Sequence, residues 1–138
     1  MEIRIVIGGC RDFNDYNFFC KYVDMYLKKI KENNQIIILS GHCRGVDIMA
    51  EKYAEERQYK LEIYFADWEK YGKFAGPKRN REMVLNADYV IAFWDGKSRG
   101  TKSLIEYAKQ YKKPIRVKTI FDLTIKVKKI FAKNNLFL

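Results

Sequence analysis

Five short runs of apolar residues recur along the chain, and each has the length of one β-strand. The runs cover residues 3–7, 35–39, 61–65, 89–93 and 114–118. They are rich in β-branched and aromatic side chains, as strands are. The second and fourth runs are almost wholly apolar, which is typical of strands buried on both faces of a parallel sheet. The last run is more polar and is predicted to be an edge strand.

Helical patterns fill the stretches between these strands. In residues 16–31, apolar side chains recur every three or four positions, as on the buried side of a helix. Further helices are predicted after Asp47, from residue 78 to 86 and from Ser103 to Ala108. Alternating strands and helices with right-handed crossovers predict the α/β class, with a Rossmann-like, doubly wound and mostly parallel sheet of about five strands flanked by helices.

Length and composition favour one domain over residues 1–138. The chain has 138 residues, and its hydrophobic fraction of 48% is sufficient for a single core. No apolar run approaches the length of a membrane span, and the first residues begin a strand rather than a signal peptide. We therefore expect a cytoplasmic protein without a membrane partner.

The net charge of +10 belongs mainly to the C-terminal end. Residues 109–133 hold nine lysines and arginines against one acid, whereas the rest of the chain is nearly balanced. From about Ile120 the apolar positions have helical spacing, so we expect a basic helix that packs on the sheet. Such a segment is suited to nucleic acid or to an acidic partner, or is simply solvated.

The cysteines and the single histidine predict no metal site. Three cysteines without CxxC spacing argue against both a disulfide framework and structural zinc. His42 is the only histidine, and we expect a loop residue with a local hydrogen bond. We expect no cofactor other than a bound ligand.

Glycine-containing turns follow three of the predicted strands. Gly8 and Gly9 are expected to end the first strand in a turn where the backbone can approach a ligand. Residues 40–47 and 95–101 each join a buried strand to a helix, an order that directs backbone N–H groups and the positive helix end toward an anion such as phosphate. Because ligands of such sheets bind at the carboxyl ends of the strands, we expect these turns to meet there.

Several side chains complete the expected phosphate site. Ser98 and Arg99 surround the last turn with donors and charge. Arg79 is the strongest single candidate, because a guanidinium holds phosphate in two parallel hydrogen bonds, and the alternative is a solvent-exposed arginine. Arg11, beside the first turn, is a further candidate, with a surface salt bridge as the alternative.

The long segment 66–77 is a candidate lid or binding loop. Its aromatic residues Trp68, Tyr71 and Phe74 are suited to stack on a base or ribose, and equally suited to anchor the loop in the core.

Four segments, taken in order, resemble a known family. They are GCRDFNDY, SGHCRGVDIMAEKYA, FADWEKYGKFAGPKRNREMV and ADYVIAFWDGKSRGT. Together they are similar to the YspA/YpsA-related branch of the SLOG superfamily, whose name joins the Smf/DprA DNA-processing proteins and the LOG phosphoribohydrolases. The resemblance implies a Rossmann-like domain that senses or processes a nucleotide or a nucleotide-derived ligand.

The resemblance also implies site residues in an SGxxxGxD element, a basic pair and a glycine–threonine phosphate loop. These residues are Gly41, Arg44, Gly45, Asp47, Arg79, Asn80, Gly96, Gly100 and Thr101. Gly9, Arg11, Ser98 and Arg99 complete the predicted ligand-binding set. Asp47 is interpreted as an organiser of the loop rather than as a catalyst.

One departure from the family pattern bears on catalysis. LOG enzymes have a catalytic glutamate three residues after the threonine, and Leu104 stands there in this chain. Glu106 lies two residues further on, roughly 200° around the helix axis. If the protein is an enzyme, we expect metal-independent hydrolysis of an N-glycosidic bond, with Glu106, Asp95 or Asp67 as the candidate acids.

Two functions from different classes follow. The first is a sensor, or an N-glycosidic hydrolase, that binds a nucleotide or ADP-ribose-like ligand. The second is a nucleic-acid-binding protein related to the DprA branch, which uses the basic C-terminus. The resemblance further implies a homodimer or a larger homo-oligomer.

Overall fold

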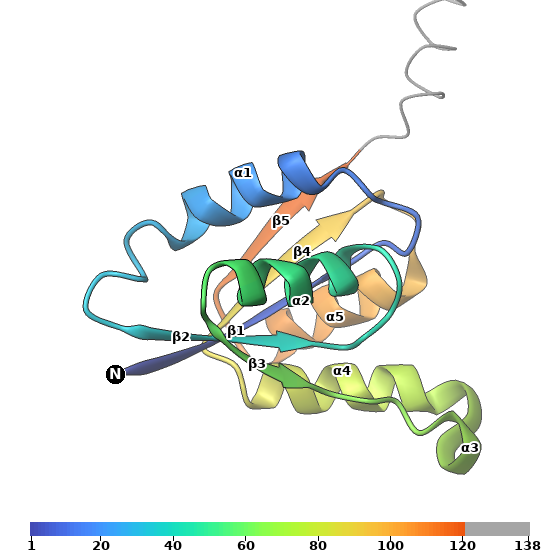
Figure 1. The fold of residues 1–138 in the computed structure, drawn as a ribbon. Coiled ribbons are helices and arrows are strands. Elements are labelled where there is room, and N and C mark those ends of the chain that lie inside the picture. Colours follow the sequence, from blue (N-terminus) through green and yellow to red (C-terminus); the bar gives the residue numbers. More distant parts are fainter. Residues whose placement is uncertain (121–138) are drawn as a thin grey trace, which may run out of the picture.

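The computed structural model of the chain describes residues 1–120. Its centre is a five-stranded sheet in the order β3-β2-β1-β4-β5, in which every neighbouring pair is parallel. The strands are β1 (Glu2–Gly9), β2 (Gln35–Ser40), β3 (Lys60–Ile63), β4 (Tyr89–Trp94) and β5 (Ile115–Thr119). The fold class predicted from the sequence is confirmed, and β5 is an edge strand as expected (Figure 1).

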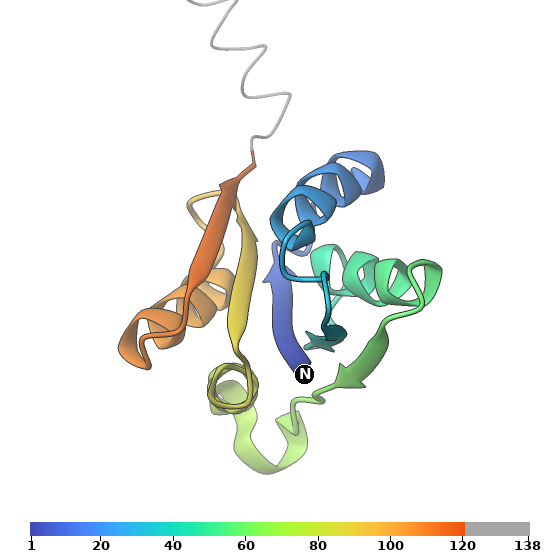
Figure 2. The same ribbon diagram turned by 90° about the vertical axis from the view of Figure 1, so that its left-hand side faces the viewer.

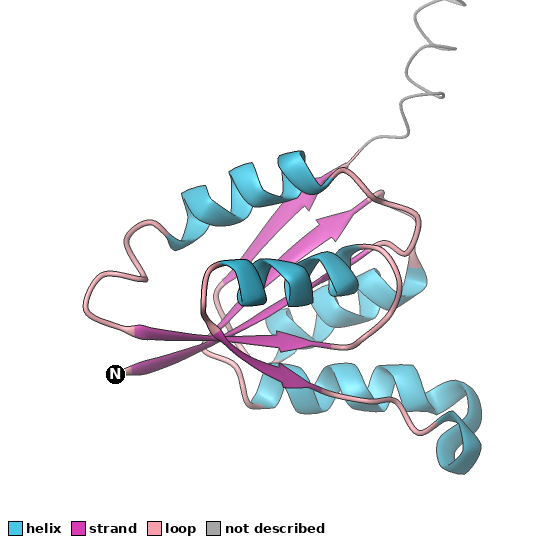
Figure 3. Ribbon diagram, viewed as in Figure 1, coloured by secondary structure: helices cyan, strands magenta, loops and turns pink. Residues whose placement is uncertain are grey.

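Helices cover both faces of the sheet (Figures 2 and 3). They are α1 (Tyr16–Leu27), α2 (Val46–Glu56), α3 (Trp68–Tyr71), the 3-10 helix η1 (Gly72–Phe74), α4 (Ala75–Leu85) and α5 (Arg99–Gln110). Helices α1 and α2 pack on one face, and α4 and α5 pack on the other. In β1 this separation follows the alternation of side chains, since Ile5 and Ile7 join the first core and Val6 joins the second.

The strand order creates a switch point at the middle of the sheet. After β1 the chain turns to the face covered by α1, whereas after β4 it turns to the face covered by α5. The loops that leave β1 and β4 therefore diverge, and a crevice opens above the carboxyl ends of these neighbouring strands. In open α/β sheets such a crevice is the usual place for a ligand.

The predicted turn at Gly8 and Gly9 is wrong, because both residues belong to β1. They pair with Ala92 and Phe93 of β4. A Cβ atom on Gly9 would overlap the carbonyl oxygen of Phe93, so the absence of a side chain permits the two strands to stay paired to the end of β1.

Helix boundaries also differ from the predictions. The first helix ends at Leu27 instead of residue 31, and turns continue to Asn34, whose side chain donates to the carbonyl oxygen of Ile30 (2.9 Å). The fourth helix begins at Ala75 and the fifth at Arg99, each earlier than expected. Pro77 is tolerated because it lies in the first turn of α4, where no intrahelical donor is lost.

The segment predicted as a long loop contains α3 and η1. Asp67 begins α3 by accepting the N–H of Lys70 (3.1 Å). Strand β3 is shorter than predicted and ends at Ile63. The expected closing helix from residue 120 to 133 lies outside the described residues. Within residues 1–120, no helix has both the length and the apolar character needed to cross a membrane.

We expect the Gly9→Ala variant to lose roughly 1–3 kcal/mol of unfolding free energy, because the added methyl group meets backbone that cannot move without breaking the β1–β4 pairing. Urea denaturation followed by circular dichroism measures the loss. Gly100→Ala is the matched control, since a Cβ on Gly100 meets open space. Equal stability of the two variants would contradict the close approach of β1 and β4.

Candidate functional site

A cavity of about 350 Å³ opens at the switch point between β1 and β4. Its walls come from the end of β1, from the loops after β1, β2 and β4, and from helices α2, α4 and α5. The lining residues are Gly8, Gly9, Arg11, Cys43, Asp47, Arg79, Asn80, Met83, Ser98, Arg99, Gly100, Thr101 and Leu104. The volume lies at the lower end of the range for small-molecule sites. We call this cavity the switch-point pocket.

The first turn of α5 forms one wall of the pocket. Asp95 shapes the preceding loop, because its Oδ1 accepts the N–H groups of Lys97 and Ser98 (2.8 Å each). Within the helix, the N–H of Lys102 is bonded to the carbonyl oxygen of Ser98 (3.1 Å). The three N–H groups before it, from Arg99 to Thr101, belong to the helix start and have no acceptor in their own helix. They give this wall a positive potential suited to an anion.

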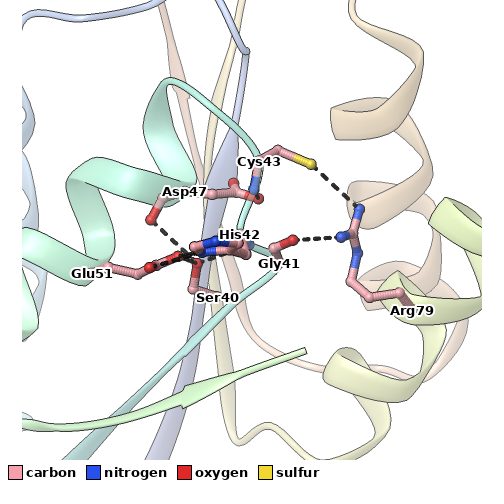
Figure 4. A network of polar contacts seen from close by, with 7 residues as sticks. All are labelled: Ser40, Gly41, His42, Cys43, Asp47, Glu51 and Arg79. Carbon is pink, nitrogen blue, oxygen red and sulfur yellow. Dashed lines mark hydrogen bonds and ion pairs between the residues drawn. The ribbon is translucent and has the colours of Figure 1, made fainter. Parts of the chain in front are cut away.

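Arg79 of α4 forms a second wall of the pocket. Its side chain is only 8% exposed. Nη1 donates to the carbonyl oxygen of Gly41 (2.6 Å), and Nη2 lies 3.9 Å from Sγ of Cys43 (Figure 4). Nε donates to Oδ1 of Asn80 (3.0 Å). Within residues 1–120, no carboxylate lies at ion-pairing distance from this guanidinium. A buried cation without an ion pair is unusual, because buried charges are normally paired.

Asn80 connects the two walls. Its Oδ1 accepts Nε of Arg79, and its Nδ2 donates to the carbonyl oxygen of Gly100 (3.2 Å). The amide group therefore holds the guanidinium at a fixed place relative to the first turn of α5. Gly41 allows Arg79 to come close to the β2 loop, since a Cβ atom there would lie 2.9 Å from Cζ of Arg79.

Asp47 of α2 places a carboxylate in the same pocket. The residue is 7% exposed, and its Oδ2 accepts the N–H of Cys43 (3.2 Å). Burial raises the pKa of Asp47 to about 6, although the N–H of Cys43 and the charge of Arg79 act in the opposite direction. A carboxyl group with this pKa changes charge close to neutral pH.

A polar network behind the pocket shapes the loop after β2. His42 has a left-handed backbone conformation (φ 59°), and its Nδ1 lies 2.9 Å from Oε2 of Glu51. The hydroxyl of Ser40 accepts the N–H of His42 (3.1 Å) and lies 2.8 Å from the same Glu51 oxygen (Figure 4). This is the local hydrogen bonding expected for His42. It fixes the loop that presents Gly41 and Cys43 to Arg79.

Most of the predicted ligand-binding residues lie in the pocket wall. These are Gly9, Arg11, Asp47, Arg79, Asn80, Ser98, Arg99, Gly100 and Thr101. Gly41 lies behind Arg79, and Gly96 shapes the α5 loop with a positive φ of 83°. Arg44 instead pairs with Asp12 at the surface (2.9 Å). Together with Gly45 it lines a separate, shallower hollow of about 290 Å³.

The predicted stacking residues do not line the switch-point pocket. Trp68 packs against Gly76, where a Cβ atom would lie 3.0 Å from its ring, and Phe74 is 67% exposed. Tyr71 lies under the ammonium group of Lys78, whose Nζ is 5.0 Å from the ring centre. The segment from Phe65 to Phe74 therefore forms an exposed group of aromatic residues at the surface, which we call the aromatic ridge.

The three candidate acids also lie outside the pocket wall. Asp67 begins α3 and Asp95 shapes the loop before α5. Burial alone would raise the pKa of Asp95, but hydrogen bonds from the N–H groups of Ser98 and Lys97 hold this pKa below its usual value. Glu106 is exposed and lies 3.9 Å from Lys102 on the outer side of α5.

The predicted set of ligand-binding residues leaves out four lining residues: Gly8, Cys43, Met83 and Leu104. Gly8 and Cys43 lie in turns that were expected at the site, whereas Met83 and Leu104 were not expected there. For these two residues, helical spacing from a predicted site residue indicates a position at the pocket. Leu104 lies one turn after Thr101 in α5, and Met83 lies one turn after Arg79 in α4. Both are apolar and belong to the core under α4 and α5, and each also lines the pocket.

The fold and the pocket define a Rossmann-like protein with a polar, anion-suited site at its switch point. A family model described as "YspA, cpYpsA-related SLOG family" matches residues 3–71, which is half of the chain. The chain belongs to this family. Gene 61 protein of Mycobacterium phage D29 is 36% identical over 86 residues, which cover 58% of this chain and 69% of that protein.

Two solved structures have a similar fold. DNA processing protein A from Helicobacter pylori, described for its single-stranded DNA binding mode, has a TM-score of 0.63 and 19% identity, and the match covers 95% of this chain and 81% of that chain. The structural genomics target TM1055 has a TM-score of 0.59 and 19% identity, over 82% of this chain and 72% of that chain. At this level of identity the likeness concerns the fold alone.

We expect the Asp47→Asn variant to change the pH dependence of stability. The folded pKa of Asp47 is raised to about 6, so the folded state binds its proton more readily than the unfolded state, where the pKa is about 3.9. The stabilising effect of this proton is complete below pH 4 and is lost as the pH rises through 6. Asparagine, which stays neutral, should therefore gain about 3 kcal/mol relative to the natural protein between pH 4 and pH 7.

Urea denaturation at a series of pH values measures this difference. Asp95→Asn is the control, because the depressed pKa of Asp95 contributes stability that is present above about pH 4 and is lost only as the pH falls further, so its difference from the natural protein should stay constant from pH 4 to pH 7. A constant difference between Asp47→Asn and the natural protein from pH 4 to pH 7 would contradict the burial of an ionised Asp47.

Proposed function

We propose that this protein binds a phosphate-bearing, nucleotide-derived ligand in the switch-point pocket. The observation that carries the proposal is the guanidinium of Arg79, which is buried and has no carboxylate within ion-pairing distance among residues 1–120. A buried cation without an ion pair is stabilised most by an anionic ligand. In this proposal the phosphate group of the ligand binds beside the guanidinium of Arg79.

The wall formed by the first turn of α5 supports the same conclusion. The first-turn N–H groups of α5 and the hydroxyl of Ser98 surround the pocket with donors, and Arg11 and Arg99 add two further positive charges. Asp47 is the only acidic residue in the wall formed by residues 1–120. The charge balance therefore favours a ligand with at least one phosphate.

Binding is favoured over hydrolysis as the role of this site. A general base for hydrolysis of an N-glycosidic bond must reach the attacking water. Asp67 and Asp95 are engaged with backbone N–H groups, and Glu106 lies on the outer side of α5. We therefore propose a sensor or binding domain and keep the hydrolase as a second role for the same pocket.

We expect Arg79→Lys to weaken the binding of nucleotide ligands by about tenfold or more, because an ammonium group cannot make the paired hydrogen bonds of a guanidinium. A thermal shift screen with AMP, ADP, ADP-ribose and their unphosphorylated nucleosides identifies a ligand. A ligand at one hundred times its dissociation constant adds about 2.7 kcal/mol of stability. Titration calorimetry then compares the variants.

Arg81→Lys is the matched control, since Arg81 lies two residues further along α4 and donates at the surface to the hydroxyl of Tyr111 (2.7 Å). This variant should bind as the natural protein does. Unchanged affinity in a folded Arg79→Lys protein, or a screen in which no phosphate-bearing ligand binds, would overturn the proposal.

A second candidate function is the binding of single-stranded nucleic acid, and the observation that favours it is the aromatic ridge. Phe65, Trp68 and Phe74 are exposed, and Lys73 lies over the ring of Phe74 (5.4 Å). Exposed aromatic rings among lysines are suited to stack on bases and to neutralise phosphates. The role of the basic C-terminal end in this second function stays a prediction, because residues 121–138 lie outside the described residues.

The double variant Trp68→Ala, Phe74→Ala separates the two functions. We expect it to keep its affinity for the small ligand, because neither residue lines the pocket. Fluorescence anisotropy with an oligothymidylate of about 20 nucleotides, at salt concentrations from 50 to 200 mM, tests the alternative. Tight binding that falls steeply with salt and is lost in the double variant would favour nucleic acid as the ligand.

A further inference from the structure

A second large hollow lies far from the switch-point pocket, on the face of the sheet that α1 and α2 cover. It is a groove of about 780 Å³ between the end of α1, the turn that follows this helix, and the first residues of β4 and β5. We call it the β5 groove. Apolar and aromatic side chains form most of its floor, and they include Met25, Tyr26, Ile30, Tyr89 and Ile91.

Basic side chains stand at the rim of the β5 groove. Lys28 and Lys29 follow α1, Arg116 belongs to β5, and all three are exposed. Within residues 1–120, none of the three forms an ion pair. An apolar floor with a basic rim suits an amphipathic helix that lies with its C-terminal end at the rim, because this end of a helix carries partial negative charge.

The described part of the chain ends on the same face of the sheet. Ile120 is 6% exposed and belongs to the core under α1 and α2. Its N–H donates to the carbonyl oxygen of Trp94 (2.9 Å), which fixes its backbone beside the end of β4. Residue 121 therefore follows at the carboxyl end of β5, whereas the groove lies at the other end of this strand. A segment that turns back along β5 leads to the groove.

The sequence after Ile120 has the length and the pattern for this path. The five residues of β5 span roughly 17 Å, a length that a helix covers in about 11 residues. Leu123, Val127, Ile130 and Phe131 recur at helical spacing. In a helix antiparallel to β5, the last two of these positions reach the groove.

We infer that residues 121–133 form an amphipathic helix that docks in the β5 groove, antiparallel to β5, with Ile130 and Phe131 on the apolar floor. The tether to β5 favours this segment over a separate partner, because it gives the segment a high effective concentration at the groove. The inference goes beyond the proposed function and does not depend on what the switch-point pocket binds.

This docking assigns the basic residues of the segment to a particular surface. Lys129 and Lys133 lie on the side of the predicted helix away from the apolar positions, so they face solvent on the α1 side of the sheet. The aromatic ridge lies beside α4, which covers the opposite face (Figure 2). The basic segment and the aromatic ridge are then two separate surfaces rather than one.

Amide hydrogen exchange of the full chain, followed by mass spectrometry of peptides from residues 121–133, tests the inference. We expect these amides to exchange at least about tenfold more slowly than those of a free peptide of the same sequence. In Met25→Glu a carboxylate enters the apolar groove, so the exchange rate should return to within about threefold of the free peptide. Because Met25 is 56% exposed, peptides from β1 and β4 should keep their protection.

Leu85→Glu is the matched control, because Leu85 is an exposed apolar residue (42%) at the end of α4, on the opposite face of the sheet. It should leave the exchange of residues 121–133 unchanged. Phe131→Glu changes only the docking segment and should remove its protection as Met25→Glu does. This variant decides the question if Met25→Glu fails to fold.

Three results would overturn the inference. The first is a natural protein in which residues 121–133 exchange as fast as the free peptide. The second is protection that persists in both glutamate variants, which would place the segment elsewhere. The third is protection that appears only as the protein concentration is raised, which would mean that the segment docks on a second copy of the chain.

Discussion

The buried guanidinium of Arg79 is the contact on which the site depends. It joins α4 to the loop after β2 through the carbonyl oxygen of Gly41, and through Asn80 it is coupled to the first turn of α5. Three segments that are distant in the sequence are thus held around one positive charge. The protein supplies hydrogen bonds to this charge but, within residues 1–120, no ion pair. The proposed function assigns the role of the missing counter-charge to an anionic ligand.

The location of the site follows from the strand order. Because β1 and β4 are neighbours and their following helices cover opposite faces, the chain cannot close the space above the ends of these two strands. Glycine at the end of β1 then allows β4 to approach closely and keeps the floor of the pocket free of side chains. The same topology is shared with proteins of only 19% identity, which shows that the arrangement needs few particular residues.

The strands were predictable because each is a largely apolar run. The turns after β2 and β4 were predictable because glycine and polar residues follow these buried strands. The helix starts at Ala75 and Arg99 were not predictable, because glycine and proline in these stretches are typical of loops. In the structure Trp68 covers Gly76, and Asp95 fixes the backbone before α5. The position of Trp68 depends on α3, whose orientation no local pattern encodes. Arg44 pairs at the surface with Asp12, which lies 32 positions away in the sequence, and no local pattern indicates this partner.

The contact between Gly45 and the loop after β1 has a consequence for the energetics of binding. Gly45 adopts a positive φ of 83°, and a side chain there would overlap the carbonyl oxygens of Cys10 and Arg11. The N–H of Val46 also donates to the carbonyl oxygen of Cys10 (3.3 Å). The backbone that carries Arg11 and the helix start that carries Asp47 are therefore locked together before any ligand arrives. A preorganised site of this kind loses little conformational entropy on association, which favours tight binding of even a small molecule.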